Sequence, residues 1–95
     1  MLTSSAHVPT DAAPRYAKQL VAHLGRKVPV EEIEGAHRLG FEFGTGLVRA
    51  ESGGVLLEAA AADPELLARV EDVLGRHLER FGRRNELVVI WRRPA

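Results

Sequence analysis

The sequence predicts an α+β domain, a two-layer sandwich in which two helices cover a mostly antiparallel sheet. Two observations support this fold class. Three short runs with strand character are joined by glycine-rich turns, and an amphipathic helical pattern lies on each side of these runs. The chain has 95 residues, the size of one domain. We therefore expect a single domain over residues 1–95, with its elements in the order β-α-β-β-β-α-β.

The first strand and the first helix are expected before residue 25. Residues 2–8 alternate loosely between apolar and polar, which is typical of a strand, and Pro9 ends the run. Apolar residues then recur at spacings of three and four, which predicts a helix over about residues 12–24 with Gly25 as its cap. Residues 28–34 contain Pro29, so they form either an edge strand or an extended connector.

The middle of the chain is expected to form a three-stranded meander. The first strand places four residues on one face, namely His37, Leu39, Phe41 and Phe43. Residues 44–46 and 52–54 are rich in glycine and predict the two turns. The second and third strands are expected over residues 47–51 and 55–60.

A second helix and a last strand complete the predicted fold. Asp63 can cap a helix, Pro64 needs no partner for its missing N–H, and Glu65 favours the positive end of the helix dipole. This start predicts a helix that ends near Phe81. Residues 87–91 are apolar on both faces, which predicts a strand in the centre of the sheet.

Composition argues against several classes of function. The formal charge is zero, so a general affinity for nucleic acid or for an anionic membrane is not expected. The sequence has no cysteine, which excludes disulfides, thiolate metal sites and cysteine nucleophiles. The N-terminal residues do not resemble a signal peptide, and no apolar stretch is long enough to span a membrane. We expect a cytoplasmic protein.

Recognisable catalytic motifs are missing from the sequence. No serine lies in a nucleophile elbow, and no phosphate-binding loop is present. Gly44 and Gly46 begin a dinucleotide-like motif, but Arg49 stands where its third glycine belongs and a strand follows instead of a helix. We therefore expect no enzymatic activity and identify no catalytic residue.

Two groups of side chains are candidates for binding. His23 and His77 lie on flanks of the two helices and face each other if the helices pack side by side; they form either a metal or haem site or the polar border of the core. The second group is an arginine cluster that includes Arg76, Arg80 and Arg84, with Arg83, Arg92 and Arg93 nearby in the sequence. These arginines either bind an anion or satisfy the helix dipole and acidic neighbours.

The sequence also resembles a bacterial family of unknown function, the domain-of-unknown-function family numbered twenty-two eighteen. The resemblance spans almost the whole chain and is most specific in residues 77–81, which read HLERF, followed by a strand that ends in Trp91. Arg15-Tyr16, Gln19-Leu20 and His23 also fit its opening. The positions that match the family pattern are Arg15, Tyr16, His23, His77, Arg80 and Trp91.

The resemblance implies a small bacterial protein without an established activity, associated in some cases with siderophore-interacting reductases. It favours an accessory domain of iron–siderophore metabolism that binds a ferric ligand or a reductase, with Arg15, Tyr16, Arg76, Arg80, Arg84 and Trp91 as candidate ligand-binding residues. Two alternatives stay open. One is a metal- or haem-binding protein that uses His23 and His77, and the other is a structural, homo-oligomeric domain, such as a homodimer, without a small ligand.

Overall fold

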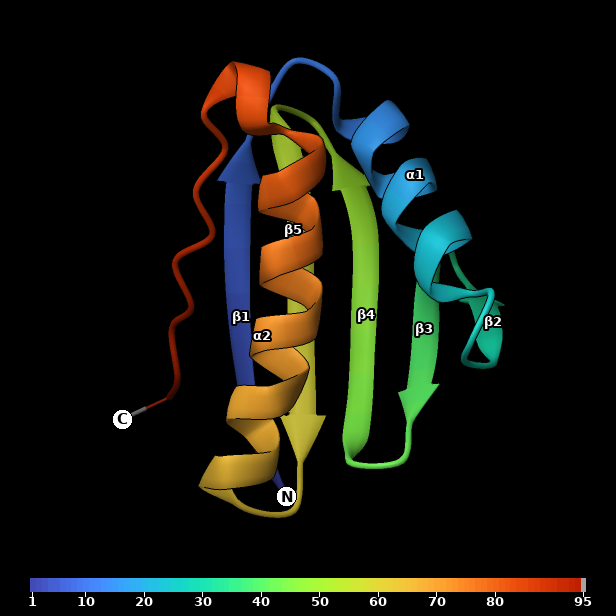
Figure 1. Ribbon diagram of the computed structural model, residues 1–95, viewed down its shortest axis with the longest axis vertical. Helices are drawn as coiled ribbons and strands as arrows, with labels where there is room; N and C mark the ends of the chain where they lie inside the picture. The colour runs from blue at the N-terminus through green and yellow to red at the C-terminus, as the bar shows by residue number, and fades with distance from the viewer. Residues whose placement is uncertain (95) are drawn as a thin grey trace.

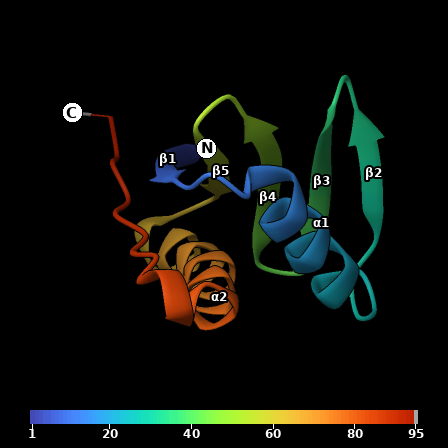
Figure 2. The same cartoon turned by 90° about the horizontal axis from the view of Figure 1, so that it is seen from above.

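The computed structural model describes residues 1–94 and consists of two layers, an antiparallel sheet and a pair of helices (Figure 1). Seen from above, both helices lie on the same side of the sheet (Figure 2). The elements in chain order are β1 (Leu2–Pro9), α1 (Ala13–Leu24), β2 (Val30–Ile33), β3 (Ala36–Phe41), β4 (Gly44–Glu51), β5 (Gly54–Ala61), α2 (Pro64–Phe81) and a short 3₁₀ helix, η1 (Arg83–Asn85). The predicted α+β sandwich is confirmed.

The sheet is a meander to which the first strand is added. Strands β2 to β5 follow one another as antiparallel neighbours, and β1 pairs with β5, so the order across the sheet is β1-β5-β4-β3-β2. The region around Val30, which the sequence left open, is the edge strand β2. Gly35 and Gly53 both have a φ of 83°, so the β2–β3 and β4–β5 turns need residues that tolerate a left-handed backbone.

The turn between β3 and β4 comes earlier than predicted. Glu42 and Phe43 form the turn, and β4 already begins at Gly44. A Cβ atom on Gly44 would lie 2.4 Å from the carbonyl oxygen of Ala60, so this glycine is needed for close contact with β5. The Phe43 ring stacks on the Phe41 ring, with their centroids 5.2 Å apart, and does not continue the strand.

Both helices agree with the sequence prediction. The side chain of Asp63 accepts a hydrogen bond of 2.8 Å from the backbone N–H of Leu66, the expected cap of α2. The apolar stripes of the two helices pack on β4 and β5, where Val48, Val55 and Leu57 are almost fully buried. Within residues 1–94, no helix is long and apolar enough to cross a membrane.

The predicted last strand is wrong. Residues 87–93, here called the C-terminal strap, run beside β1 and α2 at the border of the molecule (Figure 1). The strap pairs with the sheet in a single bridge, in which Ser5 and Arg92 exchange two backbone hydrogen bonds of 2.8 and 3.0 Å. Leu87, Val89 and Trp91 pack against the core, whereas Val88 and Ile90 are 61% and 68% exposed. The apolar run is therefore buried on one side, not on two.

The strap is held mainly by contacts with helix α2, and not by pairing with a neighbouring strand. The Glu79 carboxylate accepts a hydrogen bond of 2.9 Å from the backbone N–H of Val89, so this amide is not available to β1. Trp91 lies against Gly75, where a Cβ atom would come within 3.2 Å of the indole nitrogen. Arg93 makes two hydrogen bonds to Glu71. These three contacts draw the strap toward α2.

Candidate functional site

The packing of α1 beside α2 brings the two candidate histidines together. The imidazole centroids of His23 and His77 are 5.0 Å apart, and the two rings are tilted by 41°. Phe81, one turn after His77, presents its edge to the His23 ring at 5.5 Å. The expected facing arrangement of the two histidines is therefore present.

A backbone hydrogen bond fixes the protonation pattern of His77. Its Nδ1 lies 2.6 Å from the carbonyl oxygen of Val73, one turn earlier in α2. A carbonyl oxygen only accepts, so Nδ1 carries a proton and donates it. The Nε2 atom is left as the group that can bind a ligand, either as a donor when His77 is protonated or as a lone pair when it is neutral.

The surroundings of His23 are positive. Partial loss of water around the imidazole lowers the pKa of His23, and positive charge on His77 and on Arg26, Lys27 and Arg80 lowers it further. Arg26 and Lys27 follow the end of α1, three and four residues after His23, and Arg80 is three residues after His77. We call these five residues, namely His23, Arg26, Lys27, His77 and Arg80, the cationic helix face.

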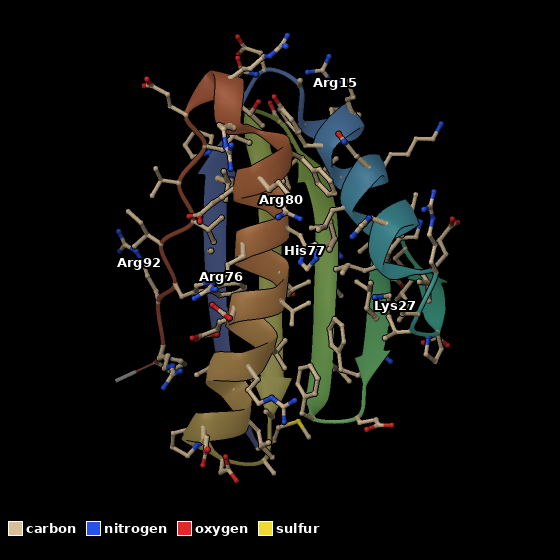
Figure 3. All side chains as sticks on the ribbon, viewed as in Figure 1. Arg15, Lys27, Arg76, His77, Arg80 and Arg92 are labelled. Atoms are coloured by element: carbon tan, nitrogen blue, oxygen red, sulfur yellow. The ribbon has the colours of Figure 1, made fainter. Side chains whose placement is uncertain are left out.

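No carboxylate neutralises the cationic helix face in the part of the chain that the structure describes. The five ion pairs found there join other residues, from His7–Glu51 in the sheet to Arg93–Glu71 at the strap. Figure 3 shows His77 on the side of α2 toward α1, with Arg80 one turn further along the helix. The arrangement favours a negatively charged ligand, because such a ligand would relieve repulsion between unpaired cations.

The same histidines fit a metal ion poorly. Catalytic zinc sites use three protein ligands and structural sites use four. Among residues 1–94, no group of three or more histidine, cysteine, aspartate or glutamate side chains is placed to hold a metal ion. His23 and His77 supply two nitrogen donors at most, and the nearby cations Arg26, Lys27 and Arg80 repel a metal cation.

The structure divides the arginine cluster that the sequence predicted. Arg76 lies on the side of α2 toward the strap (Figure 3) and forms an ion pair of 2.7 Å with Asp72. Arg84 is exposed in η1, beyond the end of α2. Of Arg76, Arg80 and Arg84, only Arg80 is therefore part of the cationic helix face.

Arg92 faces a different environment on the uncovered side of the sheet. A row of paired residues crosses the sheet there, in the order Arg38, Leu47, Glu58, Ser5 and Arg92. This row borders a groove of about 490 Å³. Because Glu58 stands between the two arginines, the groove has mixed charge and does not extend the cationic helix face.

Tyr16 and Trp91, predicted as binding residues, are packed into the structure. Tyr16 is 3% exposed, and its hydroxyl oxygen accepts a short hydrogen bond from the side-chain amide of Asn85, which ties α1 to η1. The guanidinium of Arg15 lies over the Tyr16 ring, 5.1 Å from its centroid. Trp91 covers Gly75 as part of the strap. Arg15, Tyr16 and Trp91 therefore make structural contacts within the fold.

Sequence reasoning missed two members of the cationic helix face. It did not connect Arg26 and Lys27 with His23. Their spacing of three and four residues from His23 was the available signal, because residues at this spacing lie close together on a helix. The turn after α1 keeps this proximity although the helix itself ends at Leu24.

The fold and this site define a small α+β domain with a cationic helix pair. Residues 5–92 match the model of the family described as "Uncharacterized protein conserved in bacteria (DUF2218)", and the chain belongs to this family. It is similar to PA4090 from Pseudomonas aeruginosa, whose structure was solved by NMR. The two are 29% identical with a TM-score of 0.80, over 97% of this chain and 96% of that one. None of the curated proteins matches the chain.

Proposed function

We propose that this chain is a non-enzymatic binding domain that takes an anionic ligand on the cationic helix face. The observation that carries the proposal is the pair of imidazoles 5.0 Å apart, with the positive charges of Arg26, Lys27 and Arg80 near His23. Every neighbouring charge that acts on His23 is positive. An anion would be attracted to this face and would receive hydrogen bonds from imidazole, guanidinium and ammonium groups.

Binding of an anion would be coupled to the uptake of protons. In the free protein, the lowered pKa keeps His23 mostly neutral near neutral pH. A bound anion offsets the positive charges of Arg26, Lys27 and Arg80 and therefore raises the pKa of His23 again. Affinity for the anion should then increase as the pH falls through the pKa of the bound state.

For the ligand itself, we propose a ferric chelate with negative charge, and hence an accessory role in iron–siderophore metabolism. The support is the family resemblance together with chemistry, since many ferric siderophore complexes are anionic. Arg80 is both a family-pattern position and a member of the cationic helix face. Under this proposal the partner is the chelate, and a siderophore-interacting reductase would receive the iron from it.

A second candidate function, metal binding, has one specific observation in its favour. His77 donates from Nδ1 to a backbone carbonyl, an arrangement that often orients metal-binding histidines. Metal binding is nevertheless the weaker candidate, because only two nitrogen donors are present and Arg26, Lys27 and Arg80 lie near His23. Zinc is therefore included as a competing probe in the test of the anion proposal.

The test is a thermal-shift and calorimetric titration with two ferric complexes that differ in charge. A ferric tris-catecholate is strongly anionic, whereas the ferric complex of a trihydroxamate with no other ionisable group is neutral. At one hundred times the dissociation constant, a ligand stabilises a protein by about 2.7 kcal/mol. For a domain of this size, that corresponds to a rise in Tm of roughly 10–20 °C. We expect this rise with the catecholate and not with the hydroxamate.

Matched arginine variants decide whether the cationic helix face is responsible. Arg80→Gln should weaken catecholate binding about tenfold, the effect of one charge-assisted hydrogen bond. Arg76→Gln is the control, because Arg76 lies one turn away on the same helix but is already paired with Asp72. Equal losses of catecholate affinity in both variants would mean that only the net charge of the protein matters, and would contradict a binding site on the cationic helix face. A response to zinc alone, lost in His77→Gln, would replace the anion proposal by metal binding.

The size of the particle in solution tests the remaining alternative. If the domain is structural and homo-oligomeric, ultracentrifugation should give a stable dimer or larger species, and neither ferric complex should change Tm. That combination would overturn the proposal of a ligand-binding domain.

A further inference from the structure

A second concave site lies between α1 and the strands β3 and β4, away from the cationic helix face. This space, which we call the α1 hollow, has a volume of about 480 Å³. Figure 2 shows α1 over this part of the sheet. The residues that matter for its chemistry are Ala17, Lys18, Val21, His37, Val48 and Ala50.

The hollow exists because small residues meet at this corner of the fold. Ala17 and Val21 of α1 face the sheet, and Ala50 is near the end of β4. Gly35, in the turn before β3, has no atom within 4 Å of the position that a Cβ would take. No large side chain therefore fills the space, although the neighbouring core residue Val48 is only 1% exposed.

The walls of the hollow are apolar, and two polar side chains stand at its border. Lys18 projects from α1, and His37 lies on β3 opposite Val48. His37 Nε2 is 3.6 Å from the Glu32 carboxylate, whose side chain is 78% exposed and points into solvent. In the chain up to residue 94, Lys18 forms no ion pair. The ammonium group of Lys18 is therefore a free positive charge beside an apolar cavity.

We propose that the α1 hollow binds a small apolar monocarboxylate, such as a medium-chain fatty acid or an arylacetate. The apolar body would lie against Val21 and Ala50, and the carboxylate would receive hydrogen bonds from Lys18 and His37. A volume of about 480 Å³ lies within the range of roughly 300–1,000 Å³ that is common for small-molecule sites. An amine is disfavoured at the same place because Lys18 would repel it.

This site is independent of the proposed ferric ligand. Lys18 precedes His23 by five residues, which places the two side chains roughly 140° apart around the helix. The hollow is on one flank of α1, and the contact with α2 is on the other. The two proposals therefore predict chemical-shift changes in different sets of residues.

The test is an NMR titration of the full chain with octanoate and with phenylacetate, compared with octanol and octylamine. We expect octanoate and phenylacetate to shift the amide signals of residues 17–22, 35–37 and 48–50. Lys18→Gln should weaken octanoate binding about tenfold and leave octanol unchanged, because it removes one charge-assisted hydrogen bond. Arg76→Gln, which lies outside the hollow, should bind as the unmodified chain does.

A cavity-filling variant tests the place of binding without depending on charge. Ala50→Leu should abolish binding of both acids. If Ala50→Leu does not fold, Ala22→Phe serves instead, because Ala22 borders the hollow but is exposed to solvent. Octanol or octylamine binding as tightly as octanoate would overturn the proposal, and so would the absence of shifts at millimolar acid. Shifts confined to the region of His23 and His77 would also overturn it, since the carboxylate would then occupy the cationic helix face.

Discussion

On the flank of α2 that faces the C-terminal strap, the Glu71 carboxylate receives two hydrogen bonds from Arg93, and the Glu79 carboxylate receives one from the Val89 backbone. On the flank that faces α1, His77 meets His23 within a group of cations that has no acidic member. The same helix therefore satisfies its charges on one side and leaves them unsatisfied on the other. Satisfied charges are typical of structural contacts, whereas unsatisfied charges of one sign are typical of binding surfaces.

The comparison predicts that the strap flank carries stability, and Trp91→Ala should have the largest effect. Removal of the indole exposes Gly75 and loosens the strap, at a cost of about 2 kcal/mol for a half-buried aromatic residue. Chemical denaturation should show this loss, together with a fall in Tm of roughly 8–16 °C.

Ile90→Ala is the control for this variant. Ile90 belongs to the same strap but is 68% exposed, so its truncation should change the free energy of unfolding by less than about 0.5 kcal/mol. Similar losses in the two variants would mean that the packed side of the strap does not hold it in position. The claim that the strap flank of α2 stabilises the fold would then be wrong.

The ion pair between Glu71 and Arg93 should have the next largest effect and a defined pH dependence. Burial alone would raise the pKa of Glu71, but the hydrogen bonds and the positive charge of Arg93 outweigh burial and hold it below its ordinary value of 4.5. The stabilisation is therefore complete above about pH 4.5 and is lost as the pH falls through the folded-state pKa.

Glu71→Gln should cost about 1 kcal/mol at pH 7. Denaturation curves between pH 3 and pH 7 should also show a smaller acid-induced loss for this variant than for the unmodified chain. A variant with the same acid dependence as the unmodified chain would show that Glu71 does not titrate as a partner of Arg93.

The α1 flank should respond to pH in a higher range than Glu71 does, and its effect on stability should be smaller. The pKa of His23 in the folded protein lies below its ordinary value of 6.5. At a pH between the folded-state pKa and 6.5, the unfolded chain therefore binds more protons than the folded one. The free energy of unfolding should therefore rise with pH through this window and level off above it.

His23→Gln should remove this contribution to the slope, and His7→Gln serves as the control because His7 neighbours Glu51 in the sheet. A slope that persists in His23→Gln would mean that the cationic helix face does not act on His23 in solution.

Much of this architecture could be predicted from the sequence, because local signals and tertiary contacts agree. The Asp63-Pro64-Glu65 start of α2 is capped as expected. The strap was mispredicted because an apolar run does not reveal how many of its faces become buried. Gly75 was the missed signal: a glycine inside a helix costs about 1 kcal/mol, and here it makes room for Trp91.

The candidate site was predictable in part. Helical spacing placed His23 and His77 on flanks that can meet, and they do meet. Arg26 and Lys27 stand three and four residues after His23, so the same spacing could have placed them beside it, and the turn after α1 does keep them close. Helical spacing also grouped Arg76 with Arg80, although the four-residue spacing of Asp72 and Arg76 already indicated the ion pair that forms.

The most direct measurement of the central claim is the pKa of His23, followed by NMR through the imidazole signals with and without the ferric tris-catecholate. The unsatisfied flank predicts a pKa below 6.5 in the free protein and a higher pKa when the anion is bound. A His23 pKa that is unshifted in the free protein and unaffected by the catecholate would contradict an anion site on the cationic helix face.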